Sequence, residues 1–222
     1  MAPKRSYDDG CATAHALDIV GGRWGLLIAR ELLLGPKRFT DLRGDLPSAS
    51  PTVLAQRLRE FVRAGVARRR RSPPPAPVHV YELTEWGYKL EPVVHALGGW
   101  ALQSPEPPRS APRSIDANVL SLRVMFDPEV ACGRTVRFGL NIGERRYRVC
   151  VVEGQLHLSR GEPDAPDATL DTDVPTLHAY LCGTRSLHDS LDSGDLRVRG
   201  DIRAVAELPM LFRPPQHRTP RG

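Results

Sequence analysis

Two amphipathic segments separated by a short turn, within residues 39–65, most constrain how this chain can fold. In the first segment Phe39, Leu42 and Leu46 recur at helical spacing. A turn rich in proline and serine follows at residues 47–50. Ser50 can cap a second helix because its side chain accepts hydrogen bonds from free backbone amides, and proline fits the first helical turn that comes next. The sequence therefore predicts two short helices joined by a tight turn.

The second predicted helix has one apolar face and one basic face. The apolar face consists of Leu54, Leu58, Phe61 and Val62. The opposite face carries Thr52, Gln56, Arg57, Arg59 and Arg63. This arrangement is typical of a helix-turn-helix, whose second helix enters the major groove of DNA. We therefore expect double-stranded operator DNA to be a partner of this protein.

After Gly65 the periodicity changes, which predicts strands at residues 66–71 and 78–83 with the loop SPPPAP between them. A strand pair that follows a recognition helix is a wing. Four consecutive arginines, residues 68–71, lead into its tip. They are either a solvated face or phosphate contacts; we favour phosphate contacts, because each neutralised phosphate adds salt-dependent affinity.

The expected DNA contacts follow from side-chain chemistry. Glutamine can pair with adenine edges and arginine with guanine, whereas serine and threonine suit phosphates or either base. We expect DNA contacts from Ser50, Thr52, Gln56 and Arg57 on the second helix, from Lys37 and Arg38 at the start of the first helix, and from Arg70 and Arg71 in the wing.

A further helix is predicted at residues 84–103, and its apolar face is larger than a small winged-helix core needs. Such a surplus is usually buried against a partner chain, so we expect a homodimer. Residues 104–114, SPEPPRSAPRS, lack periodicity and indicate a linker. The predicted organisation is a DNA-binding and dimerisation domain at 1–103, a linker at 104–114, a second domain at 115–213 and a disordered tail at 214–222.

The second half predicts an α+β domain with a mainly antiparallel sheet, because a run of strands is followed by helices. Strands are expected at residues 135–142, 146–152, 155–159, 168–171 and 195–199, and helices at 115–126, 174–181, 186–191 and 201–212.

Charge and cysteine content narrow the class of protein. The net charge is +5; residues 1–104 hold 15 basic and 10 acidic residues, whereas residues 105–222 hold 16 of each. This asymmetry favours a polyanion partner for the first half only. The four cysteines form no CxxC pair, so we expect neither a metal nor a cofactor. No signal-peptide core and no membrane-length apolar run are visible, so we expect a cytoplasmic protein.

The first half resembles the HxlR family of bacterial winged-helix regulators. The resemblance is carried in order by Cys11 and Leu17, GGRW at 21–24, ELLLG at 31–35, RFTDL at 38–42, LAQRLREF at 54–61, VYELTEWGYKL at 80–90 and Trp100-Ala101. It implies a dimeric transcription factor with its first and last helices at the dimer interface. Cys11 stands where many members carry a redox-sensing thiol; the alternative is a small residue buried in the dimer seam.

The second half resembles the sterol-carrier-protein fold, on the helix at 174–181 and CGTRSLHDSLDSGDLRVRGD at 182–201. The resemblance implies an apolar cavity suited to a lipid-like or aromatic ligand. His188, Asp189 and Ser190 are adjacent in sequence, whereas a catalytic triad needs residues that converge from different elements, so we do not expect an enzyme. The sequence thus predicts a regulator that responds to an apolar ligand or to oxidants; the alternative is a small-molecule carrier that binds DNA weakly.

Overall fold

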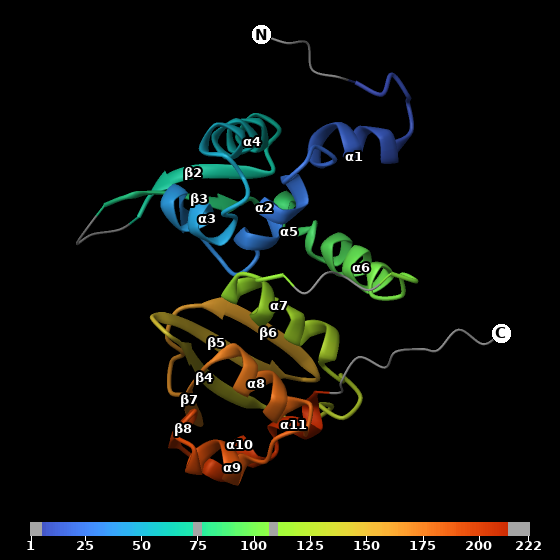
Figure 1. The fold of residues 1–222 in the computed structure, drawn as a ribbon. Coiled ribbons are helices and arrows are strands. Elements are labelled where there is room, and N and C mark those ends of the chain that lie inside the picture. Colours follow the sequence, from blue (N-terminus) through green and yellow to red (C-terminus); the bar gives the residue numbers. More distant parts are fainter. Residues whose placement is uncertain (1–5, 73–76, 107–110, 213–222) are drawn as a thin grey trace, which may run out of the picture. The chain divides into compact units, whose positions relative to one another are not determined.

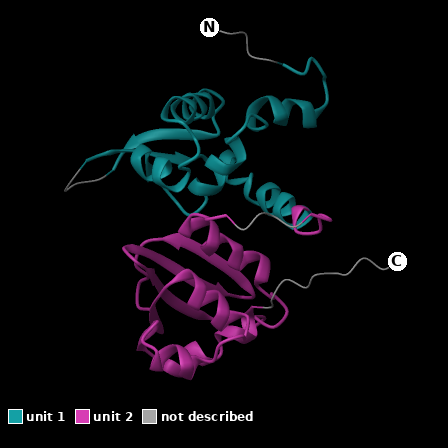
Figure 2. Cartoon of the chain, viewed as in Figure 1, with its two compact units in different colours: residues 1–100 teal, residues 101–222 magenta. Residues whose placement is uncertain are grey.

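The computed structural model of the chain describes residues 6–72, 77–106 and 111–212. The chain divides into two compact units, residues 1–100 and 101–222 (Figure 2). Most of the predicted wing tip, residues 107–110 of the predicted linker, and the predicted tail at 214–222 lie outside the described residues.

The first unit packs short helices against a small antiparallel sheet (Figure 1). Its helices are α1 (Ala12–Val20), α2 (Gly25–Leu32), α3 (Phe39–Asp45), α4 (Pro51–Arg63), α5 (Glu85–Tyr88) and α6 (Glu91–Ala101). Its strands are β1 (Lys37–Arg38), β2 (Ala67–Arg71) and β3 (His79–Leu83), in the order β1-β3-β2. The predicted helix-turn-helix is α3 and α4, and β2 and β3 form the wing, so the winged-helix fold is confirmed.

Local chemistry explains where α4 begins and ends. The Ser50 hydroxyl accepts a hydrogen bond from the Val53 amide at 3.3 Å, and Pro51 is the first helical residue. Gly65 follows the helix with φ of +75°, a conformation that glycine adopts without strain. Leu54 and Leu58 are fully buried, so the helix is fixed by its apolar face and its other face is turned outward.

The second unit has a five-stranded sheet with helices on one face. Its helices are α7 (Ile115–Met125), α8 (Val174–Leu181), α9 (Leu187–Asp192), α10 (Ile202–Ala206) and α11 (Leu208–Leu211). Its strands are β4 (Val136–Ile142), β5 (Arg145–Val152), β6 (Gln155–Arg160), β7 (Ala168–Thr172) and β8 (Leu196–Gly200). The order is β6-β5-β4-β7-β8, and only the β4–β7 pair is parallel. The predicted α+β class with a mainly antiparallel sheet is confirmed.

Two segments predicted as single helices are each divided near a proline. The segment at 84–103 forms α5 and α6, because Pro92 has no amide to donate and its ring would clash with the carbonyl of Tyr88 in a continuous helix. The segment at 201–212 forms α10 and α11, where Pro209 has the same effect.

A buried carboxylate attaches α7 to the sheet of the second unit. Asp116 is completely buried and accepts hydrogen bonds from the Tyr147 hydroxyl at 2.5 Å and from Arg145 Nη1 at 2.8 Å. The Arg160 guanidinium lies 3.4 Å from the same carboxylate. Burial and the neighbouring Asp116 charge both raise the pKa of Tyr147, so its hydroxyl remains a hydrogen-bond donor. This cluster fixes α7 above β5 and β6.

Candidate nucleic-acid interface and apolar pocket

The outward face of α4 presents polar side chains to solvent. Ser50, Thr52 and Gln56 are all exposed. Thr52 and Gln56 are four residues apart in one helix, so they lie on the same face. Their exposure follows from the buried apolar face on the opposite side of the helix. The helix therefore offers hydroxyl and amide groups that could reach base edges or phosphates.

Glu60 binds two of the side chains that the sequence predicts to face DNA. Its carboxylate accepts hydrogen bonds from Gln56 Nε2 at 3.0 Å and from Arg57 Nη1 at 2.6 Å. Burial acts to raise the pKa of Glu60, but these hydrogen bonds and the charges of Arg57 and Arg63 outweigh it and lower the pKa. Glu60 therefore stays ionised and neutralises part of this basic face.

Arg57 is less available than its place in the sequence predicts. Its side chain is only 29% exposed, and its guanidinium lies directly over Gly22, where an added β-carbon would come within 2.5 Å of the Arg57 Cζ atom. Arg57 thus contacts the turn between α1 and α2 as well as Glu60. The expectation that it extends freely from α4 toward DNA does not fit this arrangement.

The expected phosphate contact from Lys37 is corrected by the structure. Lys37 is 2% exposed, and its ammonium is 2.6 Å from Glu31 Oε2 and 2.5 Å from Asp45 Oδ2. Lys37 lies in β1 and not in a helix, and strand alternation points it into the unit. Arg38, the next residue, points the other way and is exposed, so it remains a candidate phosphate contact.

Strand alternation divides the four wing arginines between the two faces of β2. Arg70 lies on the same face of the sheet as Arg38, because both residues pair with Val80 of β3, the strand between β1 and β2. Glu82 holds Arg68 Nε and Arg70 Nε at 2.6 Å each. Burial acts to raise the pKa of Glu82, but the hydrogen bonds from Arg70 and Arg68 outweigh it and lower the pKa.

Arg71 belongs to the opposite face of the wing and is exposed. Arg70 and Arg71 therefore cannot both contact one flat surface.

Sequence reasoning missed both Glu60 and Glu82. The spacing of Gln56, Arg57 and Glu60 at i, i+4 and i, i+3 is a signal that could have identified the first, whereas the second depends on strand register.

Cys11 caps the start of α1 and is exposed. Its sulfur accepts a hydrogen bond from the Ala14 amide at 3.2 Å, and its own amide donates to Asp9 Oδ1 at 2.9 Å. The thiol is therefore accessible in the single chain. Among the residues that the structure describes, no group of histidine, cysteine and carboxylate side chains could hold a metal ion.

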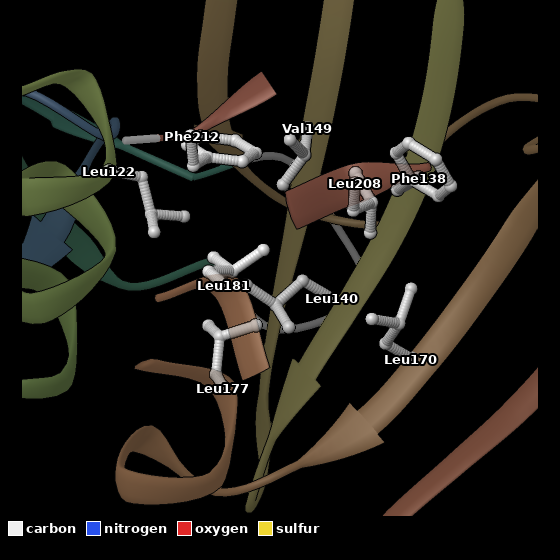
Figure 3. Close-up of a pocket in the computed structure, with 9 residues that line it drawn as sticks. All are labelled: Leu122, Phe138, Leu140, Val149, Leu170, Leu177, Leu181, Leu208 and Phe212. Carbon is white, nitrogen blue, oxygen red and sulfur yellow. The ribbon is translucent and has the colours of Figure 1, made fainter. Parts of the chain in front are cut away.

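An apolar pocket lies between the sheet and the helices of the second unit (Figure 3). Phe138, Leu140, Val149 and Leu170 reach it from the strands, and the other lining residues are Leu122, Leu177, Leu181, Leu208 and Phe212. Its volume is about 20 Å³. A single water needs about 10–15 Å³, so the pocket must widen before a drug-sized molecule can enter.

The helices of the first unit and its two-stranded wing define a winged helix-turn-helix domain. The HxlR-like helix-turn-helix family matches residues 19–108. The chain belongs to this family, and it is a transcriptional regulator of the helix-turn-helix type. YdeP of Bacillus subtilis, named as an uncharacterized HTH-type transcriptional regulator, is 38% identical over 97 residues, which are 43% of this chain and 76% of YdeP.

Further relatives and solved structures match a similar share of the chain. The HTH-type transcriptional regulator YodB of Bacillus subtilis is 36% identical over 92 residues, 41% of this chain and 82% of YodB. The structure of reduced YodB shares 34% identity, covers 45% of this chain and 98% of that chain, and has a TM-score of 0.40. The oxidized form of the redox regulator HypR shares 31% identity and also has a TM-score of 0.40, covering 43% of this chain and 99% of that chain.

The second unit matches a different family. The alkyl sulfatase C-terminal family covers residues 115–218. This match names another family than the sterol carriers, but the fold is sterol-carrier-like, so the expected fold and α+β architecture are retained and only the family name is corrected. Within the described part of the chain, no helix has the length and apolar character that crossing a membrane requires.

Proposed function

We propose that this regulator binds operator DNA as a homodimer, with α4 of each copy in a major groove. The observation that carries this proposal is the exposure of Ser50, Thr52 and Gln56 on a helix whose apolar side is buried. These residues supply base or phosphate contacts, with Thr52 and Gln56 as the main base readers. Arg38 and Arg70, which share one face of the wing sheet, supply phosphate contacts that fix the register of the protein on the duplex. Arg71, on the opposite face, contacts a different part of the backbone.

The proposed dimer is supported by α6. None of its side chains is buried, and Val93, Leu97 and Trp100 are exposed by 48%, 47% and 73%. An amphipathic helix with no buried side chain is incomplete in a single chain, and a second copy would cover the same face symmetrically. A dimer would also place two α4 helices on one palindromic site.

We propose that the pocket of the second unit is the effector site for a small apolar molecule. Its lining is entirely apolar, so it would favour a lipid-like or aromatic ligand. The ligand must widen the pocket, and it can change DNA affinity only if it binds one state of the dimer better than the other. Oxidation of the exposed Cys11 is a second input, because this thiol lies at the start of α1.

The second candidate function is a carrier or scavenger of apolar molecules, favoured by the same apolar lining. A carrier would bind its ligand without a sequence preference on DNA. No role in catalysis is proposed: His188 and Asp192 form an exposed pair 3.2 Å apart on α9, which lacks the convergence of a catalytic triad.

A mobility-shift assay with DNA from upstream of the protein's own coding sequence tests the proposal. We expect a specific shift that is lost in a Thr52→Ala/Gln56→Ala variant and retained in Gln155→Ala, a control at an exposed amide of β6. We expect hydrogen peroxide or 2-naphthol to weaken the shift. Binding that ignores sequence, together with tight 2-naphthol binding, would favour the carrier.

A further inference from the structure

In the described part of the second unit, helices cover one face of the sheet and leave the other face open, and this open face is strongly basic. Phe138, Leu140, Val149 and Leu170 point into the apolar pocket, where α7, α8 and α11 cover the sheet. The alternate residues of each strand point to the opposite face. The arginines at these alternate positions are Arg137, Arg146, Arg148, Arg197 and Arg199.

Within the strands, one carboxylate opposes these five arginines. Asp171 is the only acidic residue in the five described strands, and it accepts a hydrogen bond from Asn141 at 2.7 Å and pairs with Arg199 at 3.0 Å. Arg137, Arg148, Arg197 and Arg199 are exposed. At one end of this face Asp167 adds a second carboxylate, because its Oδ2 accepts a hydrogen bond from the Arg137 amide at 2.7 Å. The charge balance of residues 105–222, which is zero overall, therefore conceals a face with a net charge of about +3.

Residues with small side chains lie between two of the arginines. In one row across the sheet, Arg148 pairs with Gly139, Gly139 with Thr169, and Thr169 with Arg199. An added β-carbon on Gly139 would come within 2.8 Å of the Thr169 hydroxyl, so position 139 has no room for a larger side chain. Arg148 and Arg199 are three strands apart, which corresponds to about 14 Å.

We propose that this basic face, defined by Arg137, Arg146, Arg148, Arg197 and Arg199, binds the phosphate backbone of duplex DNA outside the winged-helix contact. Duplex DNA carries about one negative charge per 1.7 Å of axis, so a face about 14 Å wide meets several phosphates. The face is wide, exposed and polar, which suits a sequence-independent contact with a backbone. The proposal rests on the proposed DNA-binding function, because DNA is the polyanion that such a regulator encounters.

The test measures the affinity of the full chain for a mixed-sequence duplex of 40 base pairs by fluorescence anisotropy at several KCl concentrations. An Arg148→Gln/Arg199→Gln variant removes two charges from the basic face. We expect its plot of log affinity against log salt to be less steep by about 2 units, with about a tenfold or greater loss of affinity at 0.1 M salt. The corresponding Arg→Lys double variant should restore the slope, since lysine also neutralises a phosphate.

The matched control is Arg134→Gln/Arg203→Gln, which removes two charges outside this face; Arg134 pairs with Glu207 instead. It should bind like the wild type. Wild-type protein that binds no duplex would overturn the proposed function itself. Wild-type binding with an unchanged Arg148/Arg199 variant would overturn this inference alone. Poly-glutamate is titrated in the same way as the duplex. If the Arg148→Gln/Arg199→Gln variant loses affinity for poly-glutamate and keeps its affinity for the duplex, the inference is overturned in favour of an acidic protein partner.

Discussion

The Arg57 guanidinium of α4 is held by the Glu60 carboxylate, with 2.6 Å between Nη1 and Oε2. Both side chains are about 30% exposed, at 29% and 30%, so solvent screens the pair and its contribution to stability is small. Its effect on recognition is larger, because Glu60 also accepts a hydrogen bond from Gln56. A carboxylate at this position repels phosphates and limits the directions in which Gln56 and Arg57, two of the proposed DNA contacts, can point.

Replacement of Glu60 by glutamine should strengthen binding to DNA. The variant keeps the shape of the side chain, removes one negative charge from the side of α4 that we propose to face DNA, and weakens the hydrogen bond to Arg57. We expect affinity for a mixed-sequence duplex to rise by about threefold to tenfold, with a salt slope about 1 unit steeper. Anisotropy titrations in KCl measure both quantities.

Glu129→Gln, on the loop before β4, removes the same charge from the other unit and is the control. Unchanged affinity in Glu60→Gln would mean that α4 does not face the duplex.

If Arg57 reads a base only after release from Glu60, then Arg57→Gln should abolish a sequence-specific shift both in the wild type and in the Glu60→Gln variant. An undiminished shift would show that Arg57 contributes through its contact with Gly22 and not through DNA.

Lys37 and Arg38 are adjacent, but the same substitution should lower the stability of the fold at Lys37 and weaken DNA binding at Arg38. Lys37→Met leaves the buried carboxylates of Glu31 and Asp45 without their shared ammonium, so we expect a loss of about 3–5 kcal/mol in the free energy of unfolding. Arg38→Met alters an exposed residue and should change that free energy by less than about 0.5 kcal/mol. Arg38→Met should instead reduce the salt slope of DNA binding by about 1 unit.

Urea unfolding separates the two effects without any reference to DNA. A Lys37→Met protein as stable as the wild type would mean that the buried ion pairs do not persist in solution. An Arg38→Met protein with wild-type affinity and slope would remove Arg38 from the phosphate contacts.

The helix-turn-helix could be predicted from sequence because its information is local. The Ser50 cap, the proline after it and the apolar spacing of α4 each act within a few residues. Lys37 shows where such reasoning fails: its burial depends on the pairing of β1 with β3, 44 residues further along the chain at Tyr81. The basic face of the second unit was missed for the same reason, since strand register brings Arg148 and Arg199 into one row.

The exposed face of α6 predicts how dimerisation can be disrupted. Leu97→Glu places a charge among Val93 and Trp100, where burial against a second copy would desolvate it. We expect light scattering to report the mass of a single chain for this variant and twice that mass for the wild type. Affinity for a palindromic site should fall by at least about tenfold, because the two α4 helices no longer bind together.

Val124→Glu is the matched control, since Val124 is also exposed, by 45%, but lies on α7. It should remain a dimer. If both variants or neither become monomeric, α6 is not the specific interface.

His178 makes the stability of the second unit depend on pH. It lies on α8, and its Nε2 atom is buried with no hydrogen-bond partner among the described residues. Burial lowers the pKa of His178 from its ordinary 6.5, the Arg113 charge lowers it further, and a hydrogen bond with the Asn118 backbone opposes them. The unfolded chain therefore binds a proton more readily than the folded chain does.

The sign of the effect follows from this difference. The contribution of neutral His178 is complete above pH 6.5 and is lost as the pH falls through the lower pKa of the folded state. One proton limits the loss to about 1.4 kcal/mol per pH unit. Urea unfolding at pH 7.5 and 5.5 should therefore show a less stable second unit at the lower pH, while His178→Gln should remove this difference. His157→Gln alters an exposed histidine of β6 and should keep the wild-type dependence; a variant at position 178 that retains it would assign the effect to another group.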